Sequence, residues 1–421
     1  MIRLIAPDQW KRKPVSLDST LEARVAEVIK GVIDHGDEAL LEYTKTLDRV
    51  DLTSLSVPAS VLSSAWDEAR PAWKRAFESA AENIRRFHWK QLQQSWYIDD
   101  GDGVRLGQRI LPVESAGMYV PGGTAGYPSS VLMTAIPAQV AGVANLYLTS
   151  PPDVSTGFPH QEIMAAAHML HINNVYSVGG AQAIAALAFG TESIPAVDKI
   201  VGPGNAYVTA AKKQVFGHVD IDSLAGPSEL VVLADKTAKP EWIAHDLMAQ
   251  AEHDVMASAI LVTPDEEIAK KTCRELNKLL SVIEREEIAG PALRKYGAAI
   301  VTPSMDDAIY MVNKIAPEHL ELMVADAWVI LERIRHAGAV FIGPWSPEAV
   351  GDYYAGPNHV LPTGGTARFS SALGVEDFIR RQSVIGYSQR RLSLVADEIA
   401  LMANSERLDA HARSIKVRTN N

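Results

Sequence analysis

The sequence predicts an α/β protein built on two parallel sheets. Short runs of apolar residues alternate with helical patterns, first between residues 128 and 217 and again between 228 and 343. Strand–helix alternation of this kind is typical of parallel sheets covered by helices. With 421 residues, 47% of them hydrophobic and 22% charged, the chain is long enough for two domains and has a globular composition.

The N-terminal third is predicted to be mainly helical. Residues 20–47 match one or two amphipathic helices, and residues 60–96 have a strong helical pattern. The segment 104–120 alternates as strands do and ends in the turn PGGTAGYPSS. Residues 115–152 carry no charge, but prolines and glycines interrupt them. We therefore expect a loop, a buried helix and a buried strand there, and no membrane span.

Two runs of helices and strands follow. The first has predicted helices at VLMTAIPAQVAGV, EIMAAAHMLHI, AQAIAALAFG and NAYVTAAKKQVFG, and predicted strands at ANLYLTSPP, NNVYSVGG and DKIVGPGN. The second has predicted strands at SELVVLAD, SAILVTP, AAIVTP and GAVFIGP, and predicted helices at 240–254, 265–281 and 305–315. The tail, 374–418, is charged and helical in pattern, and no strand is predicted in it.

Charge and cysteine content exclude several classes of function. The formal net charge of −11 argues against sequence-independent binding of nucleic acid or of anionic membranes, because both need a basic surface. The single cysteine, Cys273, excludes an internal disulfide and a thiolate zinc cluster, and it fits a reducing cytoplasm. The start, MIRLIAPDQWKRK, lacks the apolar core of a signal peptide. We expect a cytoplasmic protein.

The segment DLMAQAEHDVM, residues 246–256, raises the first question of chemistry. On a helix, Asp246, Gln250 and His253 would share one face. The apolar residues that would turn this face inward are Ile243, Leu247, Met248 and Ala251. An amide and an imidazole on such a face suit either a polar boundary with solvent or a metal site, and the segment alone leaves both open.

A candidate proton-transfer pair lies in APEHLEL, residues 316–322. Pro317 can start a helix, which would place Glu318 and His319 in its first turn. The helix dipole would favour the ionised carboxylate, and an imidazole titrates near neutral pH, so the pair could pass protons. The alternative is an ordinary helix start with an incidental histidine.

Two glycine-rich junctions could bind a ligand. VGG at 178–180 and GPGN at 202–205 lie between a predicted strand and a predicted helix, where backbone N–H groups can hold a phosphate or another polar group. Neither matches the GxGxxG dinucleotide pattern, so each can equally be a plain tight turn.

Four polar residues are hard to place in an ordinary core or surface: Gln250, His253, Asp352 and His411. Asp352 belongs to a long Gly/Pro-rich loop, 346–371, and loops of this length are often functional. Two imidazoles, one carboxylate and one amide oxygen would suit zinc or a similar divalent ion. No local spacing links the four, so the pattern leaves a metal site and unrelated polar residues both open.

Longer motifs identify the family. Along the chain stand GMYVPGGTAGYPSSVLM, VGGAQAIAALAFGTE, DKIVGPGNAYVTAAKKQV, AGPSELVVLAD, DLMAQAEHD, APEHLEL, GDYYAGPNHVLPTGGTARFSS and ERLDAHA. In content and order they resemble the histidinol dehydrogenase family over nearly the whole chain. The resemblance implies two incomplete Rossmann-like parallel-sheet domains, with small N- and C-terminal segments exchanged in a homodimer.

The resemblance also implies domain boundaries. Residues 1–18 would be an N-terminal arm, and residues 119–228 a Rossmann-like NAD-binding domain. The zinc and the catalytic residues would lie in an α/β domain formed by residues 19–118 and 229–372. Residues 373–421 would form a C-terminal helical arm.

Individual residues are carried over from the family motifs. The implied ligands of one Zn²⁺ per site are Gln250, His253, Asp352 and His411, and the implied proton-transfer pair is Glu318 and His319. The implied NAD⁺ contacts are Tyr119, Gln182 and Asn205. The implied substrate contacts are Ser228, Tyr353, His359 and Glu406, together with the zinc ligands and Glu318.

The reaction implied is oxidation of L-histidinol to L-histidine, with two NAD⁺ reduced in succession through a retained aldehyde. One alternative is a sibling enzyme that oxidises another small polar alcohol with the same zinc and NAD⁺. The presence of Glu406 and His359, both expected to recognise the substrate, favours histidinol. A non-catalytic zinc-binding protein is a second alternative, and the Glu318–His319 pair argues against it.

Overall fold

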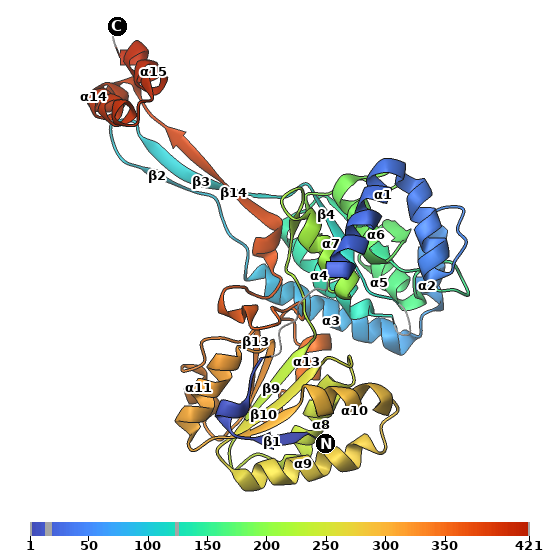
Figure 1. The fold of residues 1–421 in the computed structure, drawn as a ribbon. Helices are drawn as coiled ribbons and strands as arrows, with labels where there is room; N and C mark the ends of the chain where they lie inside the picture. The colour runs from blue at the N-terminus through green and yellow to red at the C-terminus, as the bar shows by residue number, and fades with distance from the viewer. Residues whose placement is uncertain (1, 13–18, 123–125, 420–421) are drawn as a thin grey trace.

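The computed structural model describes residues 2–12, 19–122 and 126–419. The chain forms two parallel sheets, each covered by helices, and one antiparallel ribbon that projects from them (Figure 1). The predicted pair of parallel α/β units is therefore confirmed. Within the described residues, no helix is long and apolar enough to cross a membrane.

The first sheet has five parallel strands in the order β6-β5-β4-β7-β8. Its strands are β4 (Ser115–Tyr119), β5 (Asn145–Ser150), β6 (Asn174–Ser177), β7 (Lys199–Val201) and β8 (Asp220–Ile221). Its helices are α4 (Pro128–Ala141), α5 (Gln161–Met169), α6 (Gly180–Phe189) and α7 (Ala206–Val215). Each predicted helix and strand of the first run is present. The central strand is apolar because both of its faces are covered.

Three N-terminal helices pack on this first unit. They are α1 (Ser19–Tyr43), which continues into a π-helical turn (Thr44–Asp48), α2 (Ala59–Glu68) and α3 (Pro71–Trp89). Helix α1 contacts α6 and α7, α2 contacts α5, and α3 contacts α4. This arrangement differs from the boundary expected above, in which residues 19–118 join the second sheet. The reason is that the buried side of α3, at Ile84, faces the core of α4 around Leu132.

The second sheet has six parallel strands in the order β1-β11-β10-β9-β12-β13. They are β1 (Arg3–Ile5), β9 (Glu229–Ala234), β10 (Ser258–Thr263), β11 (Ala298–Val301), β12 (His319–Met323) and β13 (Ala339–Ile342). One core contains α8 (Pro240–Ala251), α9 (Glu266–Leu280) and α10 (Glu286–Lys295), and the other contains α11 (Met305–Ile315) and α12 (Ala327–Leu331). Successive residues of β9 point into different cores, because side chains alternate across a strand. Leu230 belongs to the core with α8, and Val231 belongs to the core with α11.

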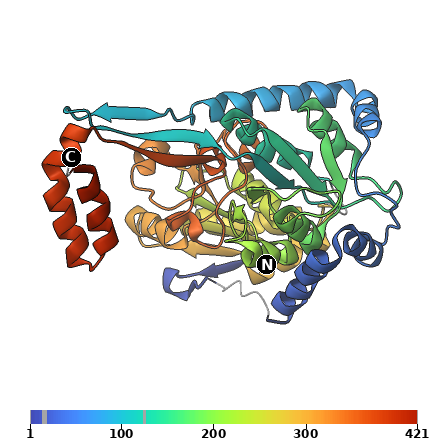
Figure 2. The ribbon, with the colours of Figure 1, turned by 90° about the horizontal axis from the view of Figure 1, so that it is seen from above.

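The third sheet is an antiparallel ribbon in the order β14-β3-β2. It consists of β2 (Trp96–Asp99), β3 (Arg105–Pro112) and β14 (Ile379–Gly386), and its far end carries α14 (Gln389–Ser405) and α15 (Asp409–Thr419) (Figures 1 and 2). The prediction of a tail without strands was therefore wrong. The cause is the exposure of β14, which has no buried face and hence no apolar alternation.

The predicted site residues lie at the carboxyl ends of strands in the first sheet and at the amino ends of strands in the second. Of the predicted NAD⁺ residues, Tyr119 ends β4, Gln182 follows β6 and Asn205 follows β7. By contrast, β9 and β12 begin with residues of the predicted catalytic region. The segment after α13 (Glu348–Tyr353) connects the two units, because the Asn358 side-chain amide donates to the carbonyl of Met133 in α4 at 2.6 Å.

Candidate active site

The predicted catalytic pair lies at the start of a strand. Helix α11 ends at Ile315, and Ala316 then adopts a left-handed conformation with φ +50°. The Pro317 and Glu318 carbonyls accept from the N–H groups of Gly338 and Ala339, both at 2.9 Å, so the chain is already extended beside β13. The prediction that Pro317 starts a helix was wrong, since pairing with a neighbouring strand overrides the local signal.

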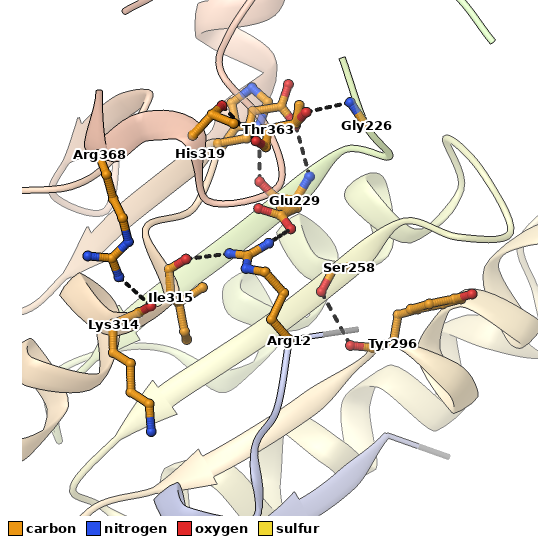
Figure 3. Close-up of polar contacts among 12 residues, drawn as sticks. Arg12, Gly226, Glu229, Ser258, Tyr296, Lys314, Ile315, His319, Thr363 and Arg368 are labelled. Atoms are coloured by element: carbon orange, nitrogen blue, oxygen red, sulfur yellow. Dashed lines mark hydrogen bonds and ion pairs between the residues drawn. The ribbon is translucent and has the colours of Figure 1, made fainter. Parts of the chain in front are cut away.

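The main chain of one residue contacts both members of this pair. The N–H of Glu229 donates to Oε2 of Glu318 at 2.9 Å. The Glu229 carbonyl lies 3.3 Å from Nδ1 of His319 (Figure 3). Glu318 and His319 are 5% and 4% exposed. The carboxylate and the imidazole are thus both buried and both oriented from β9.

Two acidic residues of α13 flank the imidazole. Oε1 of Glu348 lies 3.6 Å from Nδ1 of His319, and Oδ1 of Asp352 lies 3.6 Å from Nε2. Glu348 and Asp352 are four residues apart, so they share one face of the helix. Sequence reasoning missed Glu348, although the spacing Glu-x-x-x-Asp in SPEAVGDYY could have pointed to it.

This crowding of buried acids shifts the pKa values of the pair. Burial alone would lower the pKa of His319, but the carboxylates of Glu348, Glu318 and Asp352 outweigh it and raise this pKa to about 10. Burial raises the pKa of Glu318 to about 8 and that of Glu348 to about 7. Strong shifts with specific charged partners are typical of functional sites.

Another buried carboxylate, that of Glu321, contacts the start of α13. The backbone N–H of Glu348 donates to Oε1 of Glu321 at 2.8 Å, and the charge of Asp246 in α8 acts on the Glu321 carboxyl group. Burial raises the pKa of both Glu321 and Asp246, and the charge of Asp246 raises that of Glu321 further, so the neutral form of these carboxyls is favoured. The inward face of α8 is thereby joined to the start of α13.

Three side chains are placed to share a metal ion. His253, Glu348 and Asp352 each offer a ligand atom, and these atoms lie within 4.8 Å of one another. The prediction that Gln250 and His253 share a helical face was wrong in part, because α8 ends at Ala251 and His253 follows it in an exposed turn.

Gln250 offers the clearest sign of a ligand-binding position. Its side chain is fully buried in the last turn of α8, yet its amide oxygen and nitrogen have no hydrogen-bond partner among the described residues. A buried amide without partners is costly unless something binds it. Glu348 has the same property at both carboxylate oxygens. Amide, carboxylate and imidazole donors suit zinc, so this donor set fits the predicted metal.

The three predicted NAD⁺ contacts lie at the carboxyl edge of the first sheet. Tyr119 ends β4, and its hydroxyl accepts from the N–H of Gly180 at 3.2 Å, two residues before the buried Gln182. Oδ1 of Asn205 caps α7 by accepting from the Tyr207 and Val208 N–H groups. The structure therefore brings strand ends and helix starts together as the glycine junctions predicted.

Glycine is required at one of these junctions. Gly202 has φ +117°, and a Cβ atom there would lie 2.1 Å from the carbonyl oxygen of Tyr119. Only glycine combines that backbone conformation with so close an approach. The GPGN motif thus keeps Asn205 next to the end of β4.

Three of the predicted substrate residues lie close in the chain to residues of the candidate site. Nδ1 of His359 lies 3.0 Å from the backbone carbonyl of Asp352, and Nε2 lies 3.4 Å from Oγ of Ser130. Tyr353 ends α13 and is 60% exposed. Ser228 directly precedes β9, so it lies beside the peptide that holds the catalytic pair.

Known proteins are similar to this chain over nearly its whole length. The family model described as histidinol dehydrogenase matches residues 11–419. The chain belongs to the histidinol dehydrogenase family. It is 51% identical to histidinol dehydrogenase of Geobacillus kaustophilus over 414 residues, which is 97% of both proteins. For histidinol dehydrogenase of Halalkalibacterium halodurans the identity is 51% over 394 residues, covering 94% of this chain and 93% of that protein.

A solved structure of a family member has the same fold. The crystal structure of histidinol dehydrogenase from Elizabethkingia anophelis superposes with a TM-score of 0.94 at 37% identity, covering all of this chain and 98% of the other. Similarity at this level extends to the ribbon and its helices as well as to the two parallel sheets.

Two residues expected at the site of histidinol dehydrogenases lie far from it here. His411 belongs to α15, and Glu406 follows α14, at the outer end of the ribbon (Figures 1 and 2). Both are exposed, and the ribbon separates them from α13 and β12 of their own chain. A single chain therefore brings His253 and Asp352 together, with the buried Gln250 three residues before His253, but leaves the predicted fourth zinc ligand outside.

Proposed function

We propose that the chain oxidises L-histidinol to L-histidine through bound L-histidinaldehyde, using zinc and two NAD⁺. The observation that supports it most is the buried Glu318–His319 pair beside Glu348, Asp352 and His253, in a member of the histidinol dehydrogenase family. An alcohol oxidation needs a base at the hydroxyl, and an aldehyde oxidation needs a base for water. His319 could be the first base and Glu318 the second.

His319 would take the proton of the alcohol in the first oxidation. Its Nε2 points toward Asp352 and has no hydrogen-bond partner among the described residues, so this nitrogen is the free one. Positive charge bound near Asp352 would offset the negative charge that raises the pKa of His319. The imidazole would then become a better base near neutral pH.

Glu318 would activate water in the second oxidation. One of its oxygens accepts from the Glu229 N–H, and burial favours its neutral form, so its carboxylate is a stronger base than an exposed one. The water would add to the aldehyde carbon, and the hydrate formed would be oxidised to the carboxylate of histidine.

Zinc bound by Gln250, His253, Asp352 and a histidine from a second copy would hold the imidazole and amine of the substrate and polarise it. NAD⁺ would accept one hydride in each oxidation. On the chain itself, Tyr119, Gln182 and Asn205 would hold the nucleotide. Ser228, Tyr353, His359 and Glu406 would orient the substrate.

We propose a homodimer in which each arm completes the partner's site. Helix α15, which carries His411, lies at the outer end of the ribbon and away from α13 of its own chain (Figure 1). The ribbon (β2, β3 and β14) and its two helices also expose apolar side chains. Those at least 48% exposed include Trp96, Tyr97, Ile98, Ile385, Leu394, Leu401 and Met402. Exposed apolar surface of this kind marks an interaction site.

The proposal is tested by following NADH absorbance with a panel of amino alcohols and diols. We expect L-histidinol to be the preferred substrate and to yield two NADH per molecule. Preference for another polar alcohol would identify a sibling enzyme with the same chemistry. The absence of NADH formation with every alcohol, in zinc-loaded protein, would refute the proposed activity.

A further inference from the structure

The guanidinium group of Arg12 joins two segments that lead into the catalytic edge of the second sheet (Figure 3). It forms an ion pair with Oε1 of Glu229, the first residue of β9, and it donates to the carbonyl of Ile315, the last residue of α11. Arg12 lies beyond β1, far from both partners in sequence. Its side chain is 28% exposed and that of Glu229 is 14% exposed, so the ion pair is largely shielded from water.

Both residues that Arg12 contacts are connected to the catalytic pair, Glu229 through its main chain and Ile315 through the sequence. Glu229 holds Glu318 through its N–H and faces His319 through its carbonyl. Ile315 precedes Glu318 by three residues, and the chain between them turns through Ala316 at φ +50°, a conformation that alanine rarely adopts. A turn of this kind persists only when surrounding contacts hold it.

We propose that Arg12 is a positioning residue that fixes the Glu318–His319 pair by fastening β9 to the end of α11. The inference rests on the proposed function, because it assigns Arg12 a part in the same two proton transfers. Arg12 acts through Glu229 and Ile315, and it has no role in binding zinc. Its loss should therefore lower kcat more than it changes the KM for histidinol or the zinc content.

The surroundings of Arg12 allow a direct chemical test. Its side chain lines an open cavity of about 550 Å³, together with Trp10, Lys314 and the Gly364–Gly365 turn. Truncation of Arg12 would leave Oε1 of Glu229 unpaired at the wall of this cavity. A free guanidinium ion is small enough to enter and to replace the missing group.

Arg368 provides a matched control within the same cavity. It donates to the carbonyls of Asn313 and Lys314 at 3.0 and 2.7 Å, so it also contacts the end of α11. It makes no described contact with Glu229. A general effect of losing a cation from this cavity would thus appear in both Arg368→Ala and Arg12→Ala.

We expect Arg12→Ala to lower kcat by about 10- to 100-fold, the scale of a small misplacement of reacting groups, with the KM for histidinol and the bound zinc near wild type. Guanidinium chloride at tens of millimolar should restore part of the lost kcat, whereas sodium chloride at equal ionic strength should not. Arg12→Lys should lie between Ala and wild type, because one ammonium cannot make both contacts as well. Arg368→Ala should stay within about twofold of wild type.

Three outcomes would overturn the proposal: wild-type kcat in Arg12→Ala, equal losses in Arg12→Ala and Arg368→Ala, or equal recovery with sodium chloride. Should Arg12→Ala fail to fold, Arg12→Lys decides, since wild-type kcat there would also refute the role. A wild-type protein without activity on histidinol would instead count against the proposed function.

Discussion

Nε2 of His319 lies 3.6 Å from Oδ1 of Asp352, so the proposed general base and the proposed metal site share one carboxylate. Asp352 also has an oxygen within 4.8 Å of ligand atoms of His253 and Glu348. A divalent cation at this carboxylate would reduce the negative charge that the imidazole experiences. Metal binding and the basicity of His319 are therefore expected to be linked.

Removal of the metal should abolish turnover. A chelator should eliminate NADH formation, and added zinc should restore it. His253→Asn should lower zinc affinity by about 100-fold or more, because loss of even an outer-shell partner costs 10- to 100-fold. His245→Asn is the control, because His245 is an exposed histidine of α8, the helix that precedes His253, and its Nδ1 contacts the backbone carbonyl of Glu241. Full activity in protein shown by elemental analysis to be metal-free would exclude the zinc site.

Glu318→Gln should separate the two oxidations. The substitution preserves the shape of the side chain but removes the base, so the water-dependent step should slow by about 10²- to 10⁴-fold, the usual effect of a general base. The first hydride transfer should be less affected. Rapid-mixing measurements should show wild type producing two NADH per histidinol and the variant one fast NADH followed by a slow second. Equal slowing of both phases would assign Glu318 a different role.

The second oxidation should accelerate as the pH rises. Burial raises the pKa of Glu318 to about 8, so the neutral acid dominates below that pH and the carboxylate base above it. The rate of the second step should therefore increase between pH 7 and 9, with a midpoint near 8. Glu318→Gln, measured on L-histidinaldehyde, should lack this rise. The same midpoint in the variant would assign the titration to another group.

Asn205 should have two roles that substitutions can separate. Asn205→Ala removes the cap of α7 and should lower the free energy of unfolding by about 1 kcal/mol, while also raising the KM for NAD⁺. Asn205→Ser can still accept from the helix N–H groups, so it should keep the stability but not the KM. Thermal unfolding and NAD⁺ titration measure the two effects. A serine variant with normal KM for NAD⁺ would limit Asn205 to capping.

Elements with a regular apolar period could be predicted from the sequence, and exposed or irregular ones could not. The strands of β9 and β10 are buried on both faces and therefore read as continuous apolar runs. Strand β14 has no buried face, so its pattern gave no strand signal. Strand β12 was not predicted, because its sequence, HLELM, contains the buried Glu321 and follows a proline typical of helix starts.

The candidate site could be proposed from the sequence only through long family motifs. His253 and Asp352 lie close together in the fold, but no local spacing connects residues 250–253 with residue 352. Glu348 could have been found from its four-residue spacing to Asp352. Arg12 could not, because its contact with Glu229 spans 217 positions and depends on how β1 enters the sheet.

Each active site should be built by two chains, and mixed dimers can test this. Asp352 lies in α13, whereas His411 lies at the outer end of the ribbon and cannot reach α13 of its own chain (Figure 1). Asp352→Ala and His411→Ala should each be inactive as homodimers. In a mixed dimer, one site carries both lesions and the other carries neither, so co-refolding the two variants should recover activity.

The size of the recovery follows from the two-fold symmetry of the dimer. At random mixing half of the dimers are mixed and each has one intact site, so activity should approach about a quarter of wild type. Asp352→Ala mixed with His253→Asn is the control, because both residues belong to the same half-site. In that pair every site keeps one lesion, and no activity should return. If all ligands came from one chain, Asp352→Ala with His411→Ala would behave like the control. That result, in a mixture whose subunit exchange is confirmed by mass-tagged chains, would refute the shared site.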